Sequence, residues 1–486
     1  MGVDDTVGRG SFRLSPGLLI ARQDRITVWA LPTAFFLVIG IGFLFTFYDI
    51  FDINVSYIQT CAQIVPKCTP ATASESLGLP TLINLVGYVV GALGLTVIAD
   101  RFGRRYTMLL TLAVTGVGAL YTALVNDYPN LVAARFLTGV GIGADLAVVN
   151  TYIGEMSPAA RRAQYTALIF IMASLGAFLA IWLGLLLTTT PEPFPLGLPF
   201  ALAGPSFSGG WRIMYYLGAA FAVVGIALRW FLPESTRWLV STGRLERADE
   251  IISQMEERAS LKERLSPVTE EAPVRQEKEM GYAEIFRHPM YVRRSLILLG
   301  VWGLGYVTVY TIGAGFTSVL TSLKYPPPEA GLIAAFGTFG FILAAVFATY
   351  FGEALERKYW LPIATAILLI GGVLVAVAGQ PVRGAIPWAA FIGSMIVFFG
   401  FNVWVPQTYA WSAENYPTRA RATGFGLVDG LGHLGGGVGL IAIAPILPAI
   451  GPVASFILIA AFLGVASVIA QFGVNTRGRE LEEISP

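Results

Sequence analysis

Three aspartates interrupt long apolar stretches of the chain, and their chemistry suits the binding and release of a proton. Asp49 and Asp52 lie one helical turn apart among apolar and aromatic residues, and Asp145 lies in a glycine-rich apolar stretch. An acid at the middle of a bilayer span costs about 2.5–3.5 kcal/mol on insertion scales, so such residues usually serve a function. A carboxyl group favours its neutral form in a dry site, so one that alternates between wet and dry cavities could load and unload a proton. We expect Asp49 to carry a proton, whereas Asp52, nearer the outer surface, is either a second carrier or simply solvated.

Aromatic and amide side chains gather in the second half of the chain and predict a wall that binds a solute. They offer hydrogen bonds beside flat faces, a combination that suits sugars and polyols and also small acids. A doubly charged anion is disfavoured, because Arg135 is the only basic residue that we place in the middle of the membrane. Each aromatic residue alone is more often a packing or membrane-interface residue, so the prediction rests on the group as a whole. Its members are Tyr306, Tyr310, Asn402, Trp404, Gln407, Tyr409 and Trp411.

Three more ionisable residues fall inside apolar segments. Asp429 and His433 are four residues apart and so share one face of a helix. They form either a neutralised structural pair or a part of the functional site. Arg135 is expected near the outer end of its span, where it either pairs with an acid or extends its side chain outward.

The elements that hold these residues must be membrane helices. The chain is 55% hydrophobic and only 13% charged, whereas soluble domains carry roughly 25% charged residues. A bilayer span takes about 20 mostly apolar residues, and the sequence contains twelve such segments. The predicted spans are 27–58, 79–100, 106–126, 130–153, 163–189, 212–232, 295–323, 329–351, 360–379, 385–411, 421–447 and 452–473.

The distribution of basic residues predicts the orientation of these spans. Of the 32 Lys and Arg, all but five fall in segments on one side, which the positive-inside rule makes the cytoplasmic side. The exceptions are Lys67, Arg212, Lys324 and Arg383 on the other side and Arg135 inside a span. We therefore expect a multi-pass protein of the cytoplasmic membrane with both termini in the cytoplasm. Nucleic acid is not an expected partner, because no basic face stands apart from the membrane loops.

The spans also predict the order of the domains. We expect a cytoplasmic tail at 1–26, a six-helix bundle at 27–232, a cytoplasmic linker at 233–294, a second six-helix bundle at 295–473 and a cytoplasmic tail at 474–486. Within the linker, residues 236–264 alternate charged and apolar positions at helical spacing, which predicts an amphipathic helix under the bundle. Residues 269–278 have little apolar content and predict a flexible link.

A short stretch of the chain occurs twice. Residues 155–162 read EMSPAARR and residues 414–421 read ENYPTRAR, so the Glu, the Pro and the last Arg keep their spacing. Each copy follows one long apolar segment and precedes another. The chain therefore consists of two related halves, which in a membrane protein indicates a transporter with repeated bundles around a central site.

Motifs between the spans resemble those of the major facilitator superfamily. Residues 100–105 read DRFGRR and accompany the two repeated loops. Residues 233–239 read PESTRWL and residues 476–483 read TRGRELEE, which resemble the sugar porters and the related metabolite:proton and phosphate:proton symporters. The resemblance implies an all-α membrane protein in which twelve transmembrane helices form two pseudo-symmetric six-helix bundles. It also implies transport by alternating access.

Some positions depart from the pattern of the hexose porters. Their paired glutamines are absent from the seventh span, where residues 305–310 read GYVTVY, and the tenth span has NVWVPQ at 402–407. Thr96 stands where family members usually have glycine, and the second-half copy of the motif, at 353–358, reads EALERK. Hexose recognition of the usual kind is therefore not expected, although the transport mechanism is.

The resemblance also implies roles for two of the acids. Tyr48 and Asp49 resemble the Tyr-Asp pair of sugar porters and proton symporters, in which the acid takes and releases a proton. Residues 141–145 read GIGAD and resemble a stretch of the phosphate and metabolite symporters that ends in an acid. Asp145 therefore either takes part in coupling or substrate binding, or makes a hydrogen bond that ties the fourth helix to the first.

Charged residues of the cytoplasmic loops predict a gate where the bundles meet. We expect ion pairs between the bundles to close the cytoplasmic side in the outward-open state and to break when that side opens. The alternative is that these residues only anchor loops to the membrane face. The six residues are Asp100, Arg104, Glu155, Arg162, Glu414 and Arg421.

The two cysteines of the chain, Cys61 and Cys68, are expected in the loop between the first two spans. On the predicted topology this loop faces outward, where a disulfide can persist. The pair is either bridged or two free thiols. A bridge would hold the loop in place and perform no chemistry.

Together these features predict a secondary transporter that moves a small polar organic solute, such as a sugar, a polyol or an organic acid, together with protons. A proton-independent facilitator, a phosphate:proton symporter and a non-transporting solute sensor are the alternatives. An enzyme is not expected, because two histidines and two cysteines in one loop, without a phosphate-binding glycine loop, leave little equipment for catalysis. We expect no cofactor, no metal and a monomer.

Overall fold

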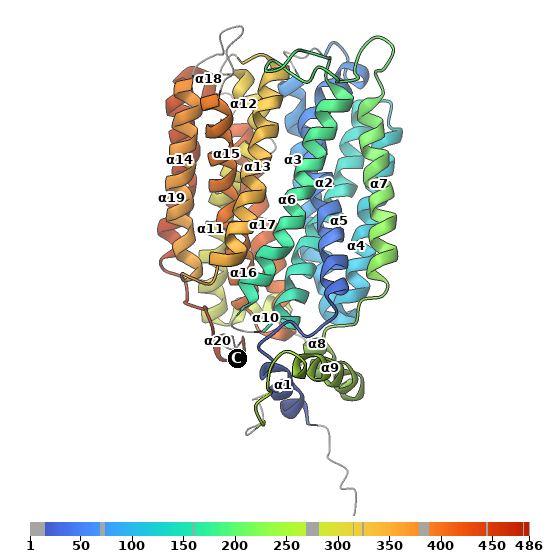
Figure 1. The fold of residues 1–486 in the computed structure, drawn as a ribbon, viewed down its shortest axis with the longest axis vertical. Helices are drawn as coiled ribbons and strands as arrows, with labels where there is room; N and C mark the ends of the chain where they lie inside the picture. Colours follow the sequence, from blue (N-terminus) through green and yellow to red (C-terminus); the bar gives the residue numbers. More distant parts are fainter. Residues whose placement is uncertain are drawn as a thin grey trace, which may run out of the picture.

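Long helices run side by side along the whole molecule (Figure 1). The computed structural model describes residues 15–68, 73–158, 161–268, 281–313, 315–322, 325–378, 388–443, 446–479 and 481–485. In these ranges, 12 helices are long and apolar enough to cross a membrane, which confirms the expected number. They form two bundles of six, drawn in blue to green and in yellow to red in Figure 1.

The bundles follow one another in the chain. The first consists of α2 (Thr33–Ile64), α3 (Ala73–Phe102), α4 (Arg104–Leu124), α5 (Tyr128–Met156), α6 (Arg162–Thr188) and α7 (Gly210–Arg229). The second consists of α11 (Pro289–Gly313), α13 (Pro327–Phe351), α14 (Trp360–Ala378), α15 (Trp388–Val403) continued by α16 (Val405–Glu414), α17 (Arg421–Ile443) and α19 (Pro452–Ala470). Four short elements lie between the spans of the second bundle: α12 (Phe316–Ser322), η2 (Arg357–Tyr359), η3 (Thr418–Ala420) and α18 (Leu447–Ile450).

The two bundles are built alike. In the first, the first span α2 packs against the fifth, α6, and the second span α3 packs against the fourth, α5. In the second bundle the equivalent pairs are α11 with α17 and α13 with α15. The bundles meet along α3 with α17 and along α6 with α13, which again pairs second spans with fifth spans. The repeated sequence motif therefore marks a repeated structure.

The outer faces of the helices are apolar. Val223 of α7, Ile370 of α14 and Val468 of α19 are each more than 60% exposed. A helix that is apolar on its exposed face as well as on its packed face is typical of a membrane span. The molecule is therefore a multi-pass membrane protein.

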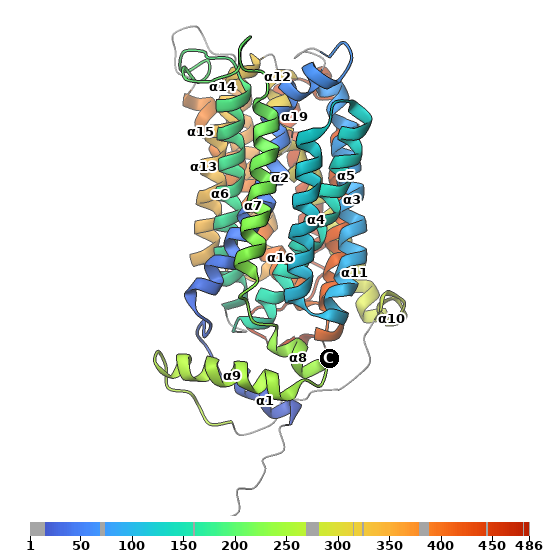
Figure 2. The same ribbon diagram turned by 90° about the vertical axis from the view of Figure 1, so that its right-hand side faces the viewer.

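Several short helices lie together at one end of the bundles, which we call the linker end. α1 (Pro16–Asp24), α8 (Thr236–Ser241) and α9 (Leu245–Ser260) form a layer below the bundles, with α10 (Tyr282–Arg287) beside it (Figure 2). The C-terminal helix α20 (Leu481–Ile484) lies at the same end. The amphipathic helix predicted over 236–264 is present as α9 but is shorter than predicted, because Gly243 adopts a φ of 76° and separates α8 from α9. The predicted link at 269–278 lies outside the described residues.

Three predicted spans differ from the observed helices. The first begins only after Pro32 and extends to Ile64. The seventh is divided into α11 and α12, and the tenth is divided into α15 and α16 at Trp404. Pro406 explains the second division, because proline has no N–H to donate and its ring clashes with the preceding turn.

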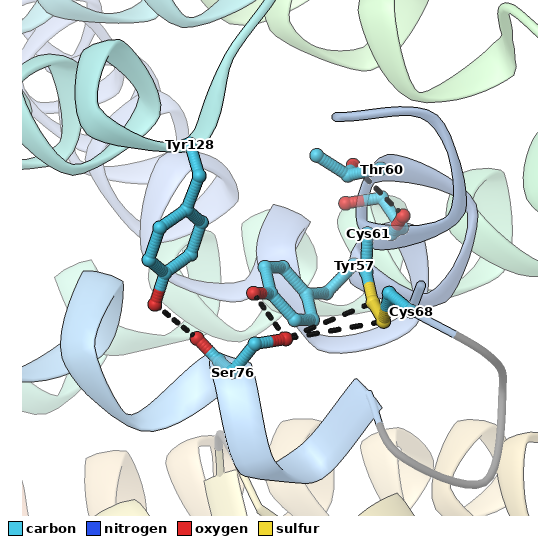
Figure 3. The surroundings of a disulfide bond; sticks show 7 residues. Tyr57, Thr60, Cys61, Cys68, Ser76 and Tyr128 are labelled. Carbon is cyan, nitrogen blue, oxygen red and sulfur yellow. Dashed lines mark hydrogen bonds between the residues drawn. A yellow bond between two sulfur atoms is a disulfide. The ribbon is translucent and has the colours of Figure 1, made fainter. Parts of the chain in front are cut away.

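The two cysteines form a disulfide (Figure 3). Their Cα atoms are 5.8 Å apart. The prediction that both lie in the loop is wrong for Cys61, which belongs to the last turn of α2. Ser76 of α3 contacts both sulfur atoms and also accepts a 2.9 Å hydrogen bond from the Tyr57 hydroxyl. The bridge therefore fixes the α2–α3 connection to both helices.

Candidate functional site

A small cavity lies between the two bundles. Its volume is about 50 Å³, which holds only a few water molecules at roughly 10–15 Å³ each. Most of its wall is aromatic or aliphatic, and both bundles contribute to it. The apolar lining consists of Phe47, Ile50, Phe51, Leu146, Phe170, Val309, Phe341, Phe401 and Val405, and the polar lining of Tyr306, Tyr310, Asn402, Tyr409 and His433.

A buried carboxylate lies behind the polar part of this wall. Asp429 of α17 accepts 2.5 Å hydrogen bonds from the hydroxyls of Tyr306 and Tyr88. The Tyr306 hydroxyl is also 2.8 Å from that of Tyr409. Because Tyr88 belongs to α3, this carboxylate connects the second bundle to the first. Charge-assisted hydrogen bonds of this kind are among the strongest in proteins.

His433, one turn after Asp429, lies between two tyrosine rings. Its ring centroid is 3.6 Å from that of Tyr88 and 3.7 Å from that of Tyr306. Its Nδ1 is 2.7 Å from the backbone oxygen of Asp429. A carbonyl oxygen can only accept, so Nδ1 carries the proton of this bond. Both faces and one nitrogen of the imidazole are thus occupied. The remaining edge of the ring is the part of His433 that lines the cavity.

Asn402 supplies a further polar group to the cavity. Its Nδ2 donates a 2.9 Å hydrogen bond to the backbone oxygen of Phe341. Its Oδ1 is buried and has no hydrogen-bond partner among the described residues. Since buried polar atoms are nearly always paired, this oxygen is an acceptor available to a ligand or to water.

A second buried cluster of charges lies inside the first bundle, next to the cavity-lining turns of α2. Asp52 Oδ1 is 3.3 Å from Nη1 of Arg135, and Arg135 Nη2 donates to the backbone oxygen of Asp49 at 3.4 Å. Asp49 Oδ1 and Asp52 Oδ2 have no hydrogen-bond partner in the described part of the chain. The three side chains are at most 3% exposed. The guanidinium group of Arg135 therefore pairs with the carboxyl group of Asp52, whereas it contacts Asp49 only at the backbone oxygen.

Asp145 has a different environment from the other two acids. It forms an ion pair with Arg229 at the end of α7 and accepts hydrogen bonds from Thr46 of α2 at 2.9 Å and Thr111 of α4 at 2.8 Å. Both charged side chains are fully buried. These contacts fit the second of the two predicted roles of Asp145, a hydrogen bond that joins the fourth span to the first. The side chain of Arg229, expected on the cytoplasmic side, is thus buried among the helices of the first bundle.

A network of charges holds the linker end of the first bundle together. Arg104, at the start of α4, donates to Glu155 at 2.9 and 3.1 Å and lies 3.0 Å from Asp100 Oδ1. The hydroxyl of Ser235 donates to Glu155 at 2.5 Å. Glu234 accepts from the backbone N–H of Arg104, and burial raises the pKa of its carboxyl group above the usual range. The ends of α3, α4 and α5 are thereby joined to the segment that leads to α8.

The same network crosses to the second bundle. Asp100 Oδ2 accepts from the backbone N–H and the hydroxyl of Thr423, at 3.0 and 2.5 Å. Thr423 lies in the first turn of α17, where a carboxylate is favoured by the helix dipole. Arg104 also donates to the backbone oxygen of Thr418 at 3.2 Å, and Arg421 lies 3.6 Å from Glu155.

The second bundle contains the counterpart of this network. Arg357 contacts Glu414 at 3.2 Å and Glu353 at 2.7 Å, as Arg104 contacts Glu155 and Asp100. Glu353 accepts from the backbone N–H of Gln164 in the first turn of α6 at 3.3 Å, and Arg162 donates to the backbone oxygen of Arg479 at 3.3 Å. Each bundle thus presents an acid to the N-terminus of the other bundle's fifth span.

Contacts at the opposite end also join the bundles. Asn54 of α2 donates to the backbone oxygen of Gly313 at 2.6 Å and accepts from the Thr317 hydroxyl at 3.1 Å. The bundles are therefore tied together at both ends, with the small cavity between them.

Comparison with known proteins identifies the family. Residues 34–486 match the family model described as sugar (and other) transporter. The chain belongs to this family. It is a transporter of the major facilitator superfamily that acts on small-molecule solutes, and it is not an enzyme.

The transporter has relatives of several specificities. It is 26% identical over 476 residues to the niacin transporter NiaP of Acinetobacter baylyi, covering 96% of this chain and 99% of the relative. It is 26% identical over 371 residues to the 4-hydroxybenzoate transporter PcaK of the same organism, covering 74% of each chain, and 26% identical over 430 residues to the glucose transporter GlcP of Staphylococcus epidermidis, covering 85% and 88%. The proton:xylose symporter XylE bound to 6-bromo-6-deoxy-D-glucose has the same fold, with a TM-score of 0.72, 18% identity and coverage of 93% and 98%.

The structure divides the predicted binding wall of this transporter. Tyr306, Tyr310, Asn402 and Tyr409 line the cavity, whereas Trp404, Gln407 and Trp411 are not part of its lining. The Trp404 ring packs on Trp302, and Trp411 donates to the backbone oxygen of Val474 at 2.9 Å near the linker end.

Two residues important to the site, Tyr88 and Arg357, are absent from the predicted set. Asp429 and His433 were predicted as either a structural pair or a part of the functional site, and their spacing indicates one helix face but not which residues that face contacts. In the structure Tyr88 contacts both of them, and Arg357 holds the second-half network. Arg357 could have been found by aligning 353–358 with 100–105, since both stretches place an arginine four residues after an acid.

Proposed function

We propose that the protein is a proton-coupled symporter that carries a small organic solute across the cytoplasmic membrane by alternating access. The linker end is the cytoplasmic side in this proposal, because the predicted spans leave most basic residues there. The observation that supports proton coupling is the buried cluster in which Asp52 pairs with Arg135 while Oδ1 of the neighbouring Asp49 has no hydrogen-bond partner among the described residues.

The charges of this cluster explain why a proton would be required. With both carboxyl groups ionised, the site holds two negative charges and one positive charge away from water. A buried charge without a partner is strongly unfavourable. One bound proton makes the cluster neutral. Asp52 is already paired with Arg135, so the proton belongs on Asp49, whose Oδ1 lacks a partner within the described residues.

Two sets of contacts suit alternating access. The network of Asp100, Arg104 and Glu155 closes the cytoplasmic side, and the bonds of Asn54 close the outer side. Opening either side requires breaking its own set while the other stays intact. When Asp49 binds a proton, the cluster of Asp49, Asp52 and Arg135 is neutral, and the two bundles can close around the cavity without burying a net charge. Closure with the solute inside therefore requires a bound proton as well.

The substrate proposed is a small organic solute. The relatives are named for niacin, 4-hydroxybenzoate and glucose, and a probable polyol transporter of Arabidopsis thaliana is 28% identical over 455 residues. A phosphate substrate is disfavoured by a cavity lining that contains no Lys or Arg among the described residues.

Proteoliposomes test the proposal. The full chain is reconstituted, and uptake of labelled niacin, 4-hydroxybenzoate, glucose and inositol is measured with and without an inward proton gradient. For any solute that enters, the gradient should raise uptake, and adding the solute should alkalinise the outside. Asp49→Asn should abolish both effects. Asp127→Asn is the matched control, because Asp127 is an exposed helix cap that asparagine replaces well. Gradient-independent uptake that Asp49→Asn leaves unchanged would instead establish a facilitator.

A further inference from the structure

The edge of His433 is the one part of this side chain left for a ligand. The two tyrosine rings cover its faces at 3.6 and 3.7 Å, and Nδ1 is bonded to the backbone of Asp429. His433 is 3% exposed and lines the cavity. Its remaining nitrogen, Nε2, accepts a hydrogen bond when the ring is neutral and donates one when it is protonated.

The rest of the cavity is poorly suited to a polyhydroxylated solute. The hydroxyls of Tyr306 and Tyr409 are bonded to each other, and that of Tyr306 also to Asp429. Besides His433, the polar atoms of the lining with capacity left are the Asn402 oxygen, the Tyr310 hydroxyl and the Tyr409 hydroxyl oxygen, which can still accept. A sugar would leave several hydroxyls unpaired, which is costly in a buried site. Flat rings suit a wall made mainly of phenylalanine and tyrosine.

His433 is also the only group in the described lining that gains a positive charge by taking a proton. The titratable groups packed around it are Asp429 on its own helix, Tyr88 on α3, Tyr306 and Tyr310 on α11, and Tyr409 on α16. Asp429 Oδ1 lies 3.7 Å from Nδ1 and would stabilise an imidazolium. The rings of Tyr88 and Tyr306 would do the same through their faces.

We propose that the substrate is a small flat aromatic monocarboxylic acid, whose carboxyl group binds at Nε2 of His433 and whose ring lies against the phenylalanines. The proposal rests on the proposed transport function and names its substrate class. One proton lies between Nε2 and a carboxylate oxygen, so the acid is bound with one proton and no net charge. The proton comes from water, and it leaves with the acid or returns to water.

The cavity has to widen to admit such a ring. Its volume of about 50 Å³ is smaller than the roughly 150 Å³ of a protein cavity that holds benzene. The side chains of Phe51 and Phe341, which contact each other across the bundles at 5.8 Å between ring centroids, would have to move apart. A hexose with its hydration shell would require a larger opening.

Calorimetric titration of the full chain, purified in detergent, tests the substrate class without measuring transport. The ligands are benzoate, its uncharged counterpart benzamide, and glucose. Benzoate should bind, and its affinity should fall by up to about tenfold per pH unit on raising the pH, because a proton must bind with it. Benzamide should bind without this pH dependence, and glucose should not bind. Binding of glucose in preference to benzoate would overturn the proposal.

Two variants of His433 and one control complete the test. His433→Ala should weaken benzoate binding by roughly tenfold or more, since a charge-assisted hydrogen bond is lost. His433→Gln, which can donate an N–H to the carboxylate, should restore part of the affinity and remove its pH dependence. His288→Ala changes the other histidine of the chain, which is exposed beside α10, and should have no effect. Unchanged, pH-dependent benzoate binding in both His433 variants would refute the assignment. Loss of proton coupling with intact benzoate binding would refute the proposed symport only.

Discussion

Tyr88 donates a 2.5 Å hydrogen bond to Asp429 across the interface between the two bundles, although 341 positions separate the two residues. Both side chains are at most 1% exposed. The same carboxylate accepts from Tyr306 of its own bundle. A buried group shared by both bundles responds to any movement of one against the other, so this bond is a direct structural link between cavity and interface.

Removing the Tyr88 hydroxyl should weaken that link. Tyr88→Phe leaves one oxygen of a buried carboxylate without its donor, which costs about 1–3 kcal/mol. We expect a lower Tm by differential scanning fluorimetry in detergent and slower solute uptake. Tyr216→Phe is the matched control, because Tyr216 is 43% exposed on α7. Equal Tm and uptake in the two variants would mean that the Tyr88–Asp429 bond contributes nothing.

Charge reversal in the linker-end network should stop transport. In Asp100→Lys a cation replaces the carboxylate at the first turn of α17 and also faces Arg104. We expect uptake in proteoliposomes to fall to background while membrane insertion stays normal. Glu353→Lys, the equivalent change at α6, should have the same effect if the two networks are functional counterparts. Normal uptake in both variants would show that these residues only anchor loops.

Asp145 should matter for stability and not for proton coupling. Asp145→Asn leaves Arg229 buried without its counter-charge, a change that costs about 3–5 kcal/mol. Adding Arg229→Met should recover much of this loss, because the unpaired charge is then gone. Thermal unfolding measures the stability, and the proton-to-solute ratio in proteoliposomes measures the coupling. A changed proton-to-solute ratio in the stable double variant would show that Asp145 takes part in proton coupling.

The disulfide should stabilise the fold without entering the transport cycle. The bridge closes a short loop, with a sequence separation of 7, for which the loop-entropy relation gives about 2–3 kcal/mol. Cys61→Ser with Cys68→Ser should therefore lower the Tm and leave initial uptake rates unchanged at room temperature. Mass spectrometry of the unreduced protein checks the bridge itself. A strong loss of uptake in a double variant that is still fully folded would show that the α2–α3 connection moves during transport.

The sequence alone determined the class of the protein and most of its framework. Runs of about 20 apolar residues predict spans because backbone groups in a bilayer must bond within a helix. The repeat at 155–162 and 414–421 predicted two related halves, and the contacts of α2 with α6 and of α11 with α17 bear this out. It also indicated Asp49, Asp52 and the linker-end charges as groups too costly to be incidental.

Only the tertiary structure decided which of these groups meet. Helical spacing shows that Asp429 and His433 share a face, but Tyr88 reaches them from the other bundle. The pairing of Asp145 with Arg229 depends likewise on how α5 and α7 are rotated against each other. Trp404 and Gln407, which were predicted to belong to the binding wall, lie outside the cavity lining, and the Trp404 ring packs on Trp302 instead. Periodicity is a local property, whereas partners across an interface depend on helix rotation and packing, which no short stretch of sequence specifies.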